Sequence, residues 1–454
     1  MTNKENKKRK NKRPYSKKEK FFIIISFIIC ISIFLIYGYR SIKYYSKETA
    51  SKKSQVVTIA DTIINNNKIT MEKNGFRTMK NGYYFSGNVE NNYLKAFNRL
   101  YRIVDIVDGK VKIISEENEA SFIYGNETDY KKSNIYNWLN KTEEKNTGIY
   151  YNSIPGVEKL LVKTEYCDGT LKDNKVTCSN KKDSAYFSIL TIDDYIKALG
   201  KNSYLNNNKY SFILGYDEKG NPLIKNDDGG VIGVNSTEGY GVRVVMTLKK
   251  NVRLAGGNGT KDNPYILNQE GNDNYINKYI TLGNDNFQVI EENNDILKLR
   301  QTDYLVYKNN YHQIQFNDKQ ALFSVNNSNN IGYFLNRTYY QTLTYKNNLS
   351  NCTFNIGEIS TEAGFSYLNI YNNQVNTKVG LMNMFDLNTN LVENDYYLIN
   401  TTSKIGSMVK TYNYTGIIDE DKAKEKKKII PVVCIDKKLI KTGDGSSSDP
   451  YKIQ

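Results

Sequence analysis

One uninterrupted apolar segment constrains this chain more than any other feature. Residues 21–39 read FFIIISFIICISIFLIYGY and carry no charged side chain. At about 1.5 Å rise per residue, a helix of this length crosses a bilayer core of roughly 30 Å. We therefore expect one transmembrane helix, which divides the rest of the chain between two compartments.

Basic residues flank this segment and are denser on its N-terminal side. Residues 1–20 contain ten Lys or Arg, and residues 40–53 contain five. The positive-inside bias predicts a cytoplasmic tail at 1–20 and an extracellular C-terminal bulk. A cleaved signal peptide is the alternative, but its apolar stretch is usually about 7–15 residues long and ends at small residues. The run here is longer and continues into YGYRSIKYY, which favours an uncleaved signal anchor.

The formal net charge of +15 comes mainly from these two flanks, because they hold fifteen basic residues and only three acidic ones. The remaining chain is close to neutral. Nucleic-acid binding needs a charged face that tracks the phosphate backbone, so this class of function is disfavoured. Juxtamembrane basic residues instead suit topology and contact with anionic lipids.

Four cysteines follow the membrane segment. Cys167 and Cys178 enclose the polar sequence DGTLKDNKVT, which predicts a local disulfide in an extracytoplasmic domain. Free thiols are the alternative. A zinc site is the weakest reading, because it needs further ligands and the single histidine, His312, is far away in sequence. Cys352 and Cys434 form a second possible pair that their spacing does not decide.

The chain repeats one order of sequence signals. Three segments of one half have counterparts in the other: 134–142 (NIYNWLNKT) in 330–338 (NIGYFLNRT), 101–114 in 287–300 without a gap, and 256–266 (GGNGTKDNPYI) in 442–453 (TGDGSSSDPYKI). Shared composition does not produce the same signals in the same order, so we infer a tandem duplication. We expect a polar stalk at 40–78, module 1 at 79–268 and a divergent module 2 at 269–454.

Each module reads as short strands with two helices, an α+β pattern. The expected elements of the first are a hairpin turning at Asp108-Gly109, a helix near 134–141, a helix capped by Thr191 and stopped by Gly200, a hairpin over 211–225 and a closing strand at 241–248. In the second module, the later helix is expected from Thr377 through Phe385 and the closing strand at 429–435.

Four of these patterns resemble membrane-anchored surface proteins of low-GC Gram-positive bacteria. The matching segments are Tyr101-Arg102-Ile103-Val104, Trp138-Leu139-Asn140, Gly241-Val242-Arg243-Val244-Val245, and Gly256-Gly257-Asn258-Gly259-Thr260 with Asn263-Pro264-Tyr265. The resemblance implies two tandem C-type-lectin-like modules and a cell-surface location. The sequence departs from the pattern where Val244 replaces a proline and where Phe212-Ile213-Leu214 replaces a tryptophan-containing strand. A lectin-type Glu-Pro-Asn calcium motif does not occur in the sequence.

Several local features have a functional and a structural interpretation. Trp138 and Phe334 occupy equivalent helical positions, where stacking on sugars competes with core packing, and core packing is favoured. Asp227-Asp228, or Asp444 with Asp449, have calcium-binding oxygens without a complete loop pattern. The glycines at 256–260 favour a turn over a phosphate cradle, because no strand-to-helix context accompanies them. The run at 419–428 is expected to be a solvated loop.

No catalytic signature stands out. His312 has no nucleophile motif beside it, and no pair of carboxylates rises above the background. We therefore predict neither an enzyme nor a bound cofactor or metal. The leading hypothesis is a single-pass surface protein that binds a glycan, a cell-wall polymer or a protein. The alternative is a structural component of an envelope assembly, followed by an envelope enzyme; the oligomeric state is open.

Overall fold

The computed structural model divides the chain into two compact units, residues 1–57 and residues 58–454. The residues that it describes are 16–51, 57–126, 128–173, 175–178, 183–269, 274–318, 321–360, 362–387, 396–401, 408–413, 415 and 417–453.

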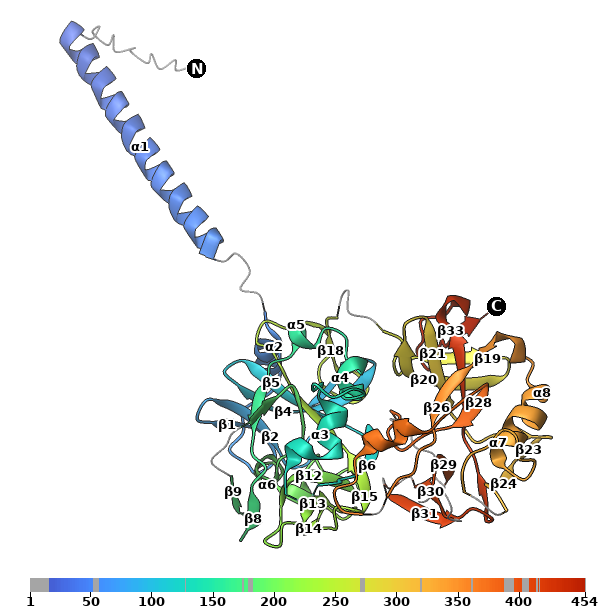
Figure 1. Ribbon diagram of the computed structural model, residues 1–454. Coiled ribbons are helices and arrows are strands. Elements are labelled where there is room, and N and C mark those ends of the chain that lie inside the picture. The colour runs from blue at the N-terminus through green and yellow to red at the C-terminus, as the bar shows by residue number, and fades with distance from the viewer. Residues whose placement is uncertain are drawn as a thin grey trace, which may run out of the picture. The chain divides into compact units, whose positions relative to one another are not determined.

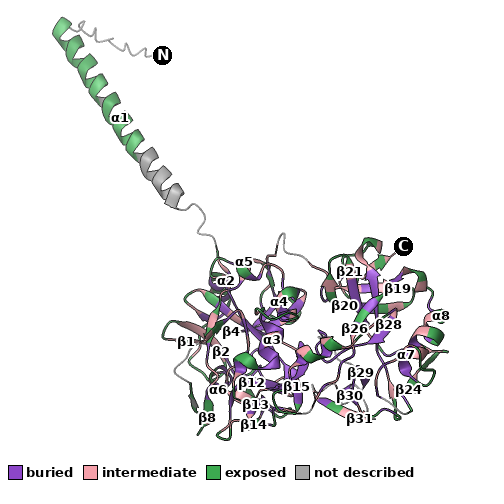
Figure 2. Ribbon diagram, viewed as in Figure 1, coloured by how far each residue is buried: buried purple, intermediate pink, exposed green. Residues whose placement is uncertain are grey.

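The first unit is one long helix, α1 (Lys17–Ser51), drawn in blue in Figure 1. Its N-terminus is capped reciprocally, because the Ser16 hydroxyl accepts from the Glu19 amide and the Glu19 carboxylate accepts from the Ser16 amide. The 24 residues Lys17–Arg40 are long and apolar enough to span a membrane. Their apolar side chains are exposed where described, as Figure 2 shows. This is the one such helix in the described part of the chain, and it covers the predicted anchor at 21–39.

The second unit begins earlier than the predicted stalk allows. Helix α2 (Ile59–Asn66) starts at Thr58, which forms a capping box with Asp61, and it buries Ile59, Ala60 and Ile63. A hairpin of β1 (Gly75–Met79) and β2 (Gly82–Ser86) follows. The stalk predicted at 40–78 therefore extends too far. A helix of two turns carries too few apolar positions for its period to be recognised in the sequence.

One antiparallel-rich sheet occurs twice with the same strand order. In the first copy, up to residue 268, the order is β17 (Leu254–Gly256), β18 (Tyr265–Leu267), β3 (Tyr93–Ala96), β4 (Arg99–Val107), β5 (Lys110–Ser115), β16 (Val244–Leu248), β11 (Phe187–Ile189). In the second copy it is β34 (Ile440–Thr442), β35 (Tyr451–Ile453), β19 (Tyr279–Leu282), β20 (Asp285–Asn293), β21 (Ile296–Gln301), β33 (Pro431–Asp436), with β28 (Val379–Leu381) and β25 (Leu349–Ser350) both on β33.

The registers of the two sheets also correspond. Tyr265 lies opposite Leu94 in one copy, and Tyr451 lies opposite Ile280 in the other. Each central hairpin has its β-bulge at the same place, at Ile103/Asp105 and at Val289/Glu291. Because a bulge and a register are independent features of a ladder, their repetition supports a duplicated origin.

A second sheet runs through both copies (Figure 1). The first copy contributes β14 (Val231–Gly233), β13 (Pro222–Lys225), β12 (Ser211–Tyr216), β15 (Gly239–Val242) and β6 (Ala120–Ile123). The second contributes, in the same order, β31 (Ile418–Lys422), β30 (Met408–Tyr412), β29 (Tyr396–Thr401), β32 (Lys426–Lys428) and β24 (Gln313–Gln315). Strands β15 and β31 join the copies through the pair Gly239 and Ile418. The two copies therefore share a sheet.

Most helices and turns of the first copy lie where the sequence predicts them. Asp108 and Gly109 have φ of 51° and 75°, as the hairpin turn requires. Helix α3 (Asn134–Leu139) is capped by Ser133, and α6 (Ile192–Lys197) is capped by Thr191. Besides short 3-10 turns, the other helices of the described chain are α4 (Ile149–Ser153), α5 (Val157–Leu160), and, in the second copy, α7 (Ile331–Tyr333), the π-helical turn η3 (Phe334–Tyr339) and α8 (Tyr340–Thr342).

The helix predicted from Thr377 through Phe385 is wrong. Its first half is occupied by strand β27 (Gln374–Thr377) and strand β28. Strand β28 pairs with β33 in the second copy, just as β11 pairs with β16 in the first, so this segment corresponds to the strand before the first copy's helix. Helix-start geometry appears only at Asn383, whose side chain accepts from the Phe385 amide while Asp386 accepts from the Asn383 amide. The continuation at 388–395 lies outside the described residues.

Two other expectations change in the structure. The closing strand at 241–248 is interrupted at Arg243, so β15 and β16 belong to different sheets. The charged run at 419–428, expected to be a loop, forms most of β31 and β32. Its charges are compatible with strands because one side remains accessible, and Lys427 pairs with Asp421 at 2.8 Å.

Candidate binding site between the two copies

A cleft of about 710 Å³ lies between the first and second copies. Residues around α4 form one wall, including Asn146 and Asn152. The other wall comes from the β20–β21 hairpin and from β26 (Cys352–Asn355) of the second copy. A smaller pocket of about 340 Å³ shares Glu291, Lys298 and Thr353 with this cleft. Both volumes lie in the range of sites that hold small ligands or short polymer segments.

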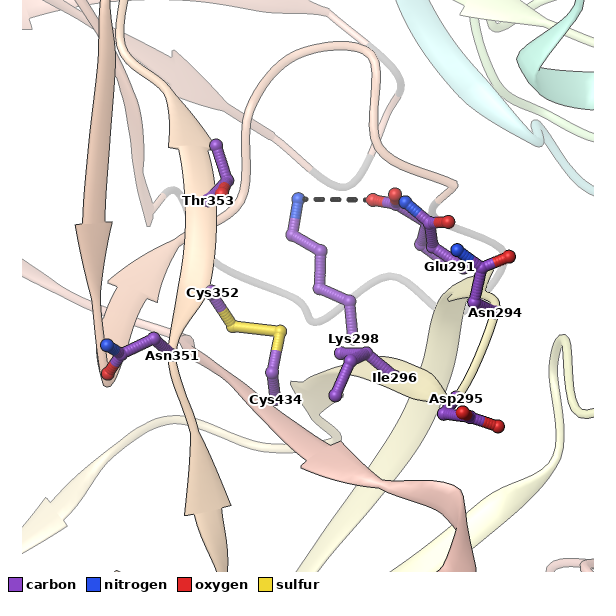
Figure 3. Close-up of a pocket in the computed structure, with 10 residues that line it drawn as sticks. Glu291, Asn294, Asp295, Ile296, Lys298, Asn351, Cys352, Thr353 and Cys434 are labelled. Carbon is purple, nitrogen blue, oxygen red and sulfur yellow. Dashed lines mark ion pairs between the residues drawn. A yellow bond between two sulfur atoms is a disulfide. The ribbon is translucent and has the colours of Figure 1, made fainter.

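A lysine held by two carboxylates stands at the centre of this region, and Figure 3 shows its pair with one of them, Glu291. Lys298 on β21 pairs with Asp386 at 2.9 Å and with Glu291 on β20 at 3.7 Å. The side chains of Lys298 and Asp386 are 6% and 8% exposed, whereas Glu291 is 51% exposed. The buried pair is thus structural, and Glu291 presents its carboxylate to the cleft.

The first copy holds the corresponding centre on the corresponding strands. Lys112 on β5 pairs with Asp105 on β4 and with Asp194 at the start of α6, both at 3.1 Å. A second ammonium group is present there, because Lys197 pairs with Asp105 at 3.3 Å and with Asp194 at 3.4 Å. Asp105 therefore has two cations where Glu291 has one among the described residues.

The charge states of these centres follow from burial and charge pairing. Burial disfavours the charged form of Lys298, but Asp386 and Glu291 outweigh it and raise the pKa of the ammonium group. Burial likewise opposes ionisation of Asp194, yet Lys112 and Lys197 hold its pKa below the usual value. Lys298 and Asp194 are therefore charged at neutral pH.

The rest of the cleft is lined mainly by amide and hydroxyl side chains with a few aromatic rings. Asn355 and Gln374 form a hydrogen-bonded pair at 2.8 Å on one wall. Tyr371 and Phe385 supply ring surface. Planar amides beside aromatic rings suit a polar ligand with many hydrogen-bonding groups, such as a glycan or a peptide backbone.

The four cysteines of the second unit are joined as two disulfides. Cys167 and Cys178 have Cα atoms 5.3 Å apart and close the short loop that the sequence indicates. Cys352 and Cys434, which the sequence left undecided, have Cα atoms 5.5 Å apart. This second disulfide fastens β26 to β33 and lines the smaller pocket beside Lys298 (Figure 3).

The aromatic residues at the repeated helical position have different surroundings. Trp138 is fully buried, and its indole N–H donates to the Phe385 carbonyl of the second copy at 3.0 Å. It packs against Phe122 and Tyr150, so it belongs to the core between the copies. Phe334 is half-buried and stacks on His312 with ring centres 4.8 Å apart.

The carboxylates of three of the four candidate calcium ligands accept hydrogen bonds within their own turns. Asp228 accepts from the Gly230 amide at 2.8 Å, and Asp444 accepts from the Ser446 amide at 2.7 Å. Asp227 accepts from the Asp228 amide, and the Asp449 carbonyl accepts from Asp444 and Gly445. The described residues contain no cluster of three or more His, Cys, Asp or Glu side chains able to hold a metal ion.

The glycine-rich tails form turns that attach to the sheet. Gly257 and Gly259 have φ near +90°, and the Asn263 carbonyl accepts from Asn258 and Gly259. The Gly259 carbonyl then accepts from the Tyr93 amide of β3. Because these amides serve the turn itself, they do not form a phosphate cradle.

His312 lies away from the cleft lining. Burial and nearby Lys426 lower the pKa of its imidazole, which favours the neutral ring. Its recorded ring neighbours are Tyr307 and Phe334. This environment is one of aromatic packing.

The other repeated motif residues fasten the fold. The Asn140 side chain exchanges two hydrogen bonds with the backbone of Phe187, and Asn336 does the same with Val379. Buried Arg243 donates to the carbonyls of Ser115 and Leu205. The motifs that carry the family resemblance are therefore structural here.

The lysine centres were not predicted from the sequence, although two of the three residues of each centre align between the copies. The gapless alignment of 101–114 with 287–300 superposes an acid on an acid and Lys112 on Lys298. The third member was hidden, because the misplaced helix at 377–385 obscured the correspondence of Asp194 and Asp386. The contribution of α4 to the cleft follows from tertiary packing and has no local signal.

No family model, curated protein or solved structure matches this chain.

Proposed function

We propose that this chain is a single-pass membrane protein whose body binds an extracellular partner or envelope polymer in the cleft between its two copies. The cleft carries this proposal: a cavity of about 710 Å³, lined by amides, hydroxyls and aromatic rings, has the size and chemistry of a binding site. We propose binding rather than catalysis, because Lys298 is held by Asp386 and Glu292 is paired with Lys437.

The location is part of the same proposal. Helix α1 serves as the anchor, and the denser basic flank before it supports a cytoplasmic N-terminus. The disulfides Cys167–Cys178 and Cys352–Cys434 support an oxidising compartment for the body. A body outside the cytoplasm meets cell-wall polymers, surface glycans and other surface proteins.

We further propose that each copy is a divergent C-type-lectin-like module. The support is the sequence resemblance together with the repeated strand order and a short helix at the equivalent position of each copy, α3 and α7. The two copies share a sheet and the indole contact of Trp138, so the binding unit is the pair of copies.

A cleft-filling substitution tests the proposed function. Thr353 is exposed on β26 and lines both cavities, so Thr353→Trp fills the space without disturbing the core. The matched control is Lys452→Trp, which places the same ring on exposed β35 away from the cleft. Full-length protein in detergent micelles is titrated with purified envelope polymer and with solubilised envelope proteins from the source cells.

The expected result is saturable binding by the native chain and by Lys452→Trp, with at least tenfold weaker binding by Thr353→Trp. Equal binding by the two tryptophan variants would place the site elsewhere. An absence of saturable binding to either preparation would refute the binding role.

A further inference from the structure

The edge of strand β4 is closed in the first copy. Strand β3 pairs with the first half of this edge, and β2 pairs with the second half through Gly82–Val107, Tyr83–Ile106 and Tyr84–Asp105. The approach is close, because a Cβ added at Gly82 would lie 1.8 Å from the Ile106 carbonyl oxygen. A strand of this chain therefore already occupies this edge.

In the second copy, the equivalent edge of β20 has no covering strand among the described residues, and Tyr275 contacts it through a side chain, because the Tyr275 amide donates to the Glu292 carboxylate at 3.0 Å. Strand β19 pairs with residues up to Gln288, and no strand in the described part of the chain continues along Glu291–Asn293. Asn293 and Ile296 flank the hairpin turn and form a hydrogen-bonded pair, so Glu292 directs its N–H and C=O away from β21. Among the described residues, neither group has a recorded hydrogen-bond partner.

This open edge borders the cleft. Glu291, Glu292 and Asn293 all line the cavity of about 710 Å³, and none of the three is fully buried. An unpaired row of backbone groups at the side of a cavity is a template for one more strand. The first copy shows which element fits there, namely an extended segment such as β2.

The charge of the region favours a basic occupant. Of the four acidic residues that line the two cavities, Glu292 pairs with Lys437 at 3.5 Å, Asp295 with Lys438 at 3.4 Å and Asp386 with Lys298 at 2.9 Å, so Glu291 is the most weakly paired. In the first copy, Lys197 supplies a second cation to Asp105, but Glu291 has only Lys298 at 3.7 Å among the described residues. The exposed Glu291 carboxylate thus leaves a position for a cation.

We propose that the cleft takes an extended, basic peptide segment of a partner protein, which adds as a strand to the edge of β20 and pairs a lysine or arginine with Glu291. This inference rests on the proposed function and specifies its ligand. In an antiparallel arrangement like that of β2, the residue opposite Glu292 exchanges two backbone hydrogen bonds with it. The basic side chain then lies one position further, opposite Glu291.

The chain itself supplies a defined probe. Residues 80–88 contain β2, and Tyr84 in this segment lies opposite Asp105, the counterpart of Glu291. The probe is the synthetic peptide of residues 80–88 with Tyr84→Lys, titrated by fluorescence anisotropy into the full-length protein in micelles. One control peptide carries Tyr84→Glu, and another carries an N-methyl group on the amide of Tyr83.

Two protein variants isolate the contributions of the edge and the charge. Glu292→Pro removes the outward N–H without breaking a ladder bond, and Glu292→Ala controls for loss of the side chain. Glu291→Gln removes the charge. Its matched control is Glu218→Gln, because Glu218 is 59% exposed and also pairs with one lysine at 3.7 Å.

We expect saturable binding of the lysine peptide, weakened at least tenfold by the N-methyl group and by Glu292→Pro relative to Glu292→Ala. Glu291→Gln is expected to weaken it at least threefold, with Glu218→Gln unchanged. Equal binding of methylated and unmethylated peptides, or no binding of either, would overturn the inference. If envelope binding is lost in Thr353→Trp but is unaffected by Glu292→Pro, the proposed function stands and the strand inference fails.

Discussion

The two copies differ in how the outer edge of the same central strand is covered. In the first copy, the edge of β4 is covered by β2, and Asp105 is neutralised by Lys112 and Lys197. In the second copy, no strand of the described chain covers the corresponding edge of β20, and exposed Glu291 has one lysine partner there. Duplication supplies the same sheet twice, and an edge without a covering strand among the described residues makes one of the two a candidate site.

This comparison shows how a divergent repeat can gain a site. The sequence of the second copy departs further from the shared motifs, which at first suggests decay. Its buried parts are nevertheless kept, since Lys298 and Asp386 remain paired and Asn336 still fastens β28. One difference from the first copy lies at the cleft, where exposed Glu291 pairs with Lys298 alone among the described residues.

The largest expected difference in stability is between alanine substitutions at the repeated aromatic position, Trp138 in the first copy and Phe334 in the second. Trp138→Ala removes a fully buried ring and its hydrogen bond to Phe385, so it should lower the free energy of unfolding by about 3–5 kcal/mol. Phe334→Ala removes a half-buried ring and should cost about 1–2 kcal/mol. Urea unfolding followed by circular dichroism measures both values.

If Trp138→Ala does not fold, Trp138→Phe keeps most of the volume and removes the indole N–H. We expect that variant to lose about 1–2 kcal/mol of stability. Equal costs for Trp138→Ala and Phe334→Ala would show that the first copy does not provide the core between the copies.

Removing the disulfide that closes the longer loop should cost more stability than removing the one that closes the shorter loop. The separations are 82 residues for Cys352–Cys434 and 11 residues for Cys167–Cys178. On the chain-entropy account, replacing both cysteines of the longer loop by alanine costs about 4 kcal/mol, against about 3 kcal/mol for the shorter loop. Thermal unfolding of the two double variants under oxidising conditions tests this order, and the reverse order would contradict it.

Replacing the central lysine should cost more stability in the second copy than in the first. Lys298→Met leaves Asp386 buried with no other recorded cation among the described residues, which should cost about 3 kcal/mol of stability. Lys112→Met leaves Lys197 beside both carboxylates and should cost about 1 kcal/mol. The denaturant midpoints of the two variants, compared with that of the native chain, measure these two costs. A larger cost at Lys112 would mean that Lys197 does not compensate.

The smallest effect is a pH dependence confined to the first copy. Lys225 on β13 is buried, and burial together with nearby Arg243 lowers the pKa of its ammonium group to about 7. The unfolded state therefore binds more protons at Lys225 between pH 7 and its usual pKa, so stability rises with pH across this window.

Oxygens of Lys209, Asn226 and Asn206 accept from the Lys225 ammonium group and partly replace its hydration. The rise from pH 7 to pH 9.5 should therefore be on the order of 1–2 kcal/mol. Urea titrations of the native chain and of Lys225→Met check this. The same slope in both proteins would assign the pH dependence to other groups.

The sequence predicted local elements better than their assembly. The hairpin at Asp108-Gly109 and the caps at Ser133 and Thr191 depend on neighbours in the chain, and the first and last of these were anticipated. The split of the closing strand at Arg243 and the joint between β15 and β31 depend on contacts between distant segments. Periodicity carries no information about such contacts.

The candidate site was predictable only in part. The acid and lysine of each centre align in the sequence, but Asp386 and the cleft wall around Asn146 are brought together by the packing of one copy on the other. Whether a neighbouring strand covers the edge of β20 depends on tertiary packing. Among the described residues no strand covers it along Glu291–Asn293, and the sequence pattern of β20 itself carries no sign of this.

Residue-resolved hydrogen–deuterium exchange of the full-length chain in micelles tests the central claim most directly. It compares the amide of Ile106, which β2 covers, with the amide of Glu292, which faces the cleft. We predict slow exchange at Ile106, fast exchange at Glu292 in the free protein, and protection of Glu292 when a binding partner is added. Equal and slow exchange at both amides in the free protein would show that the second edge is already covered and would contradict the account.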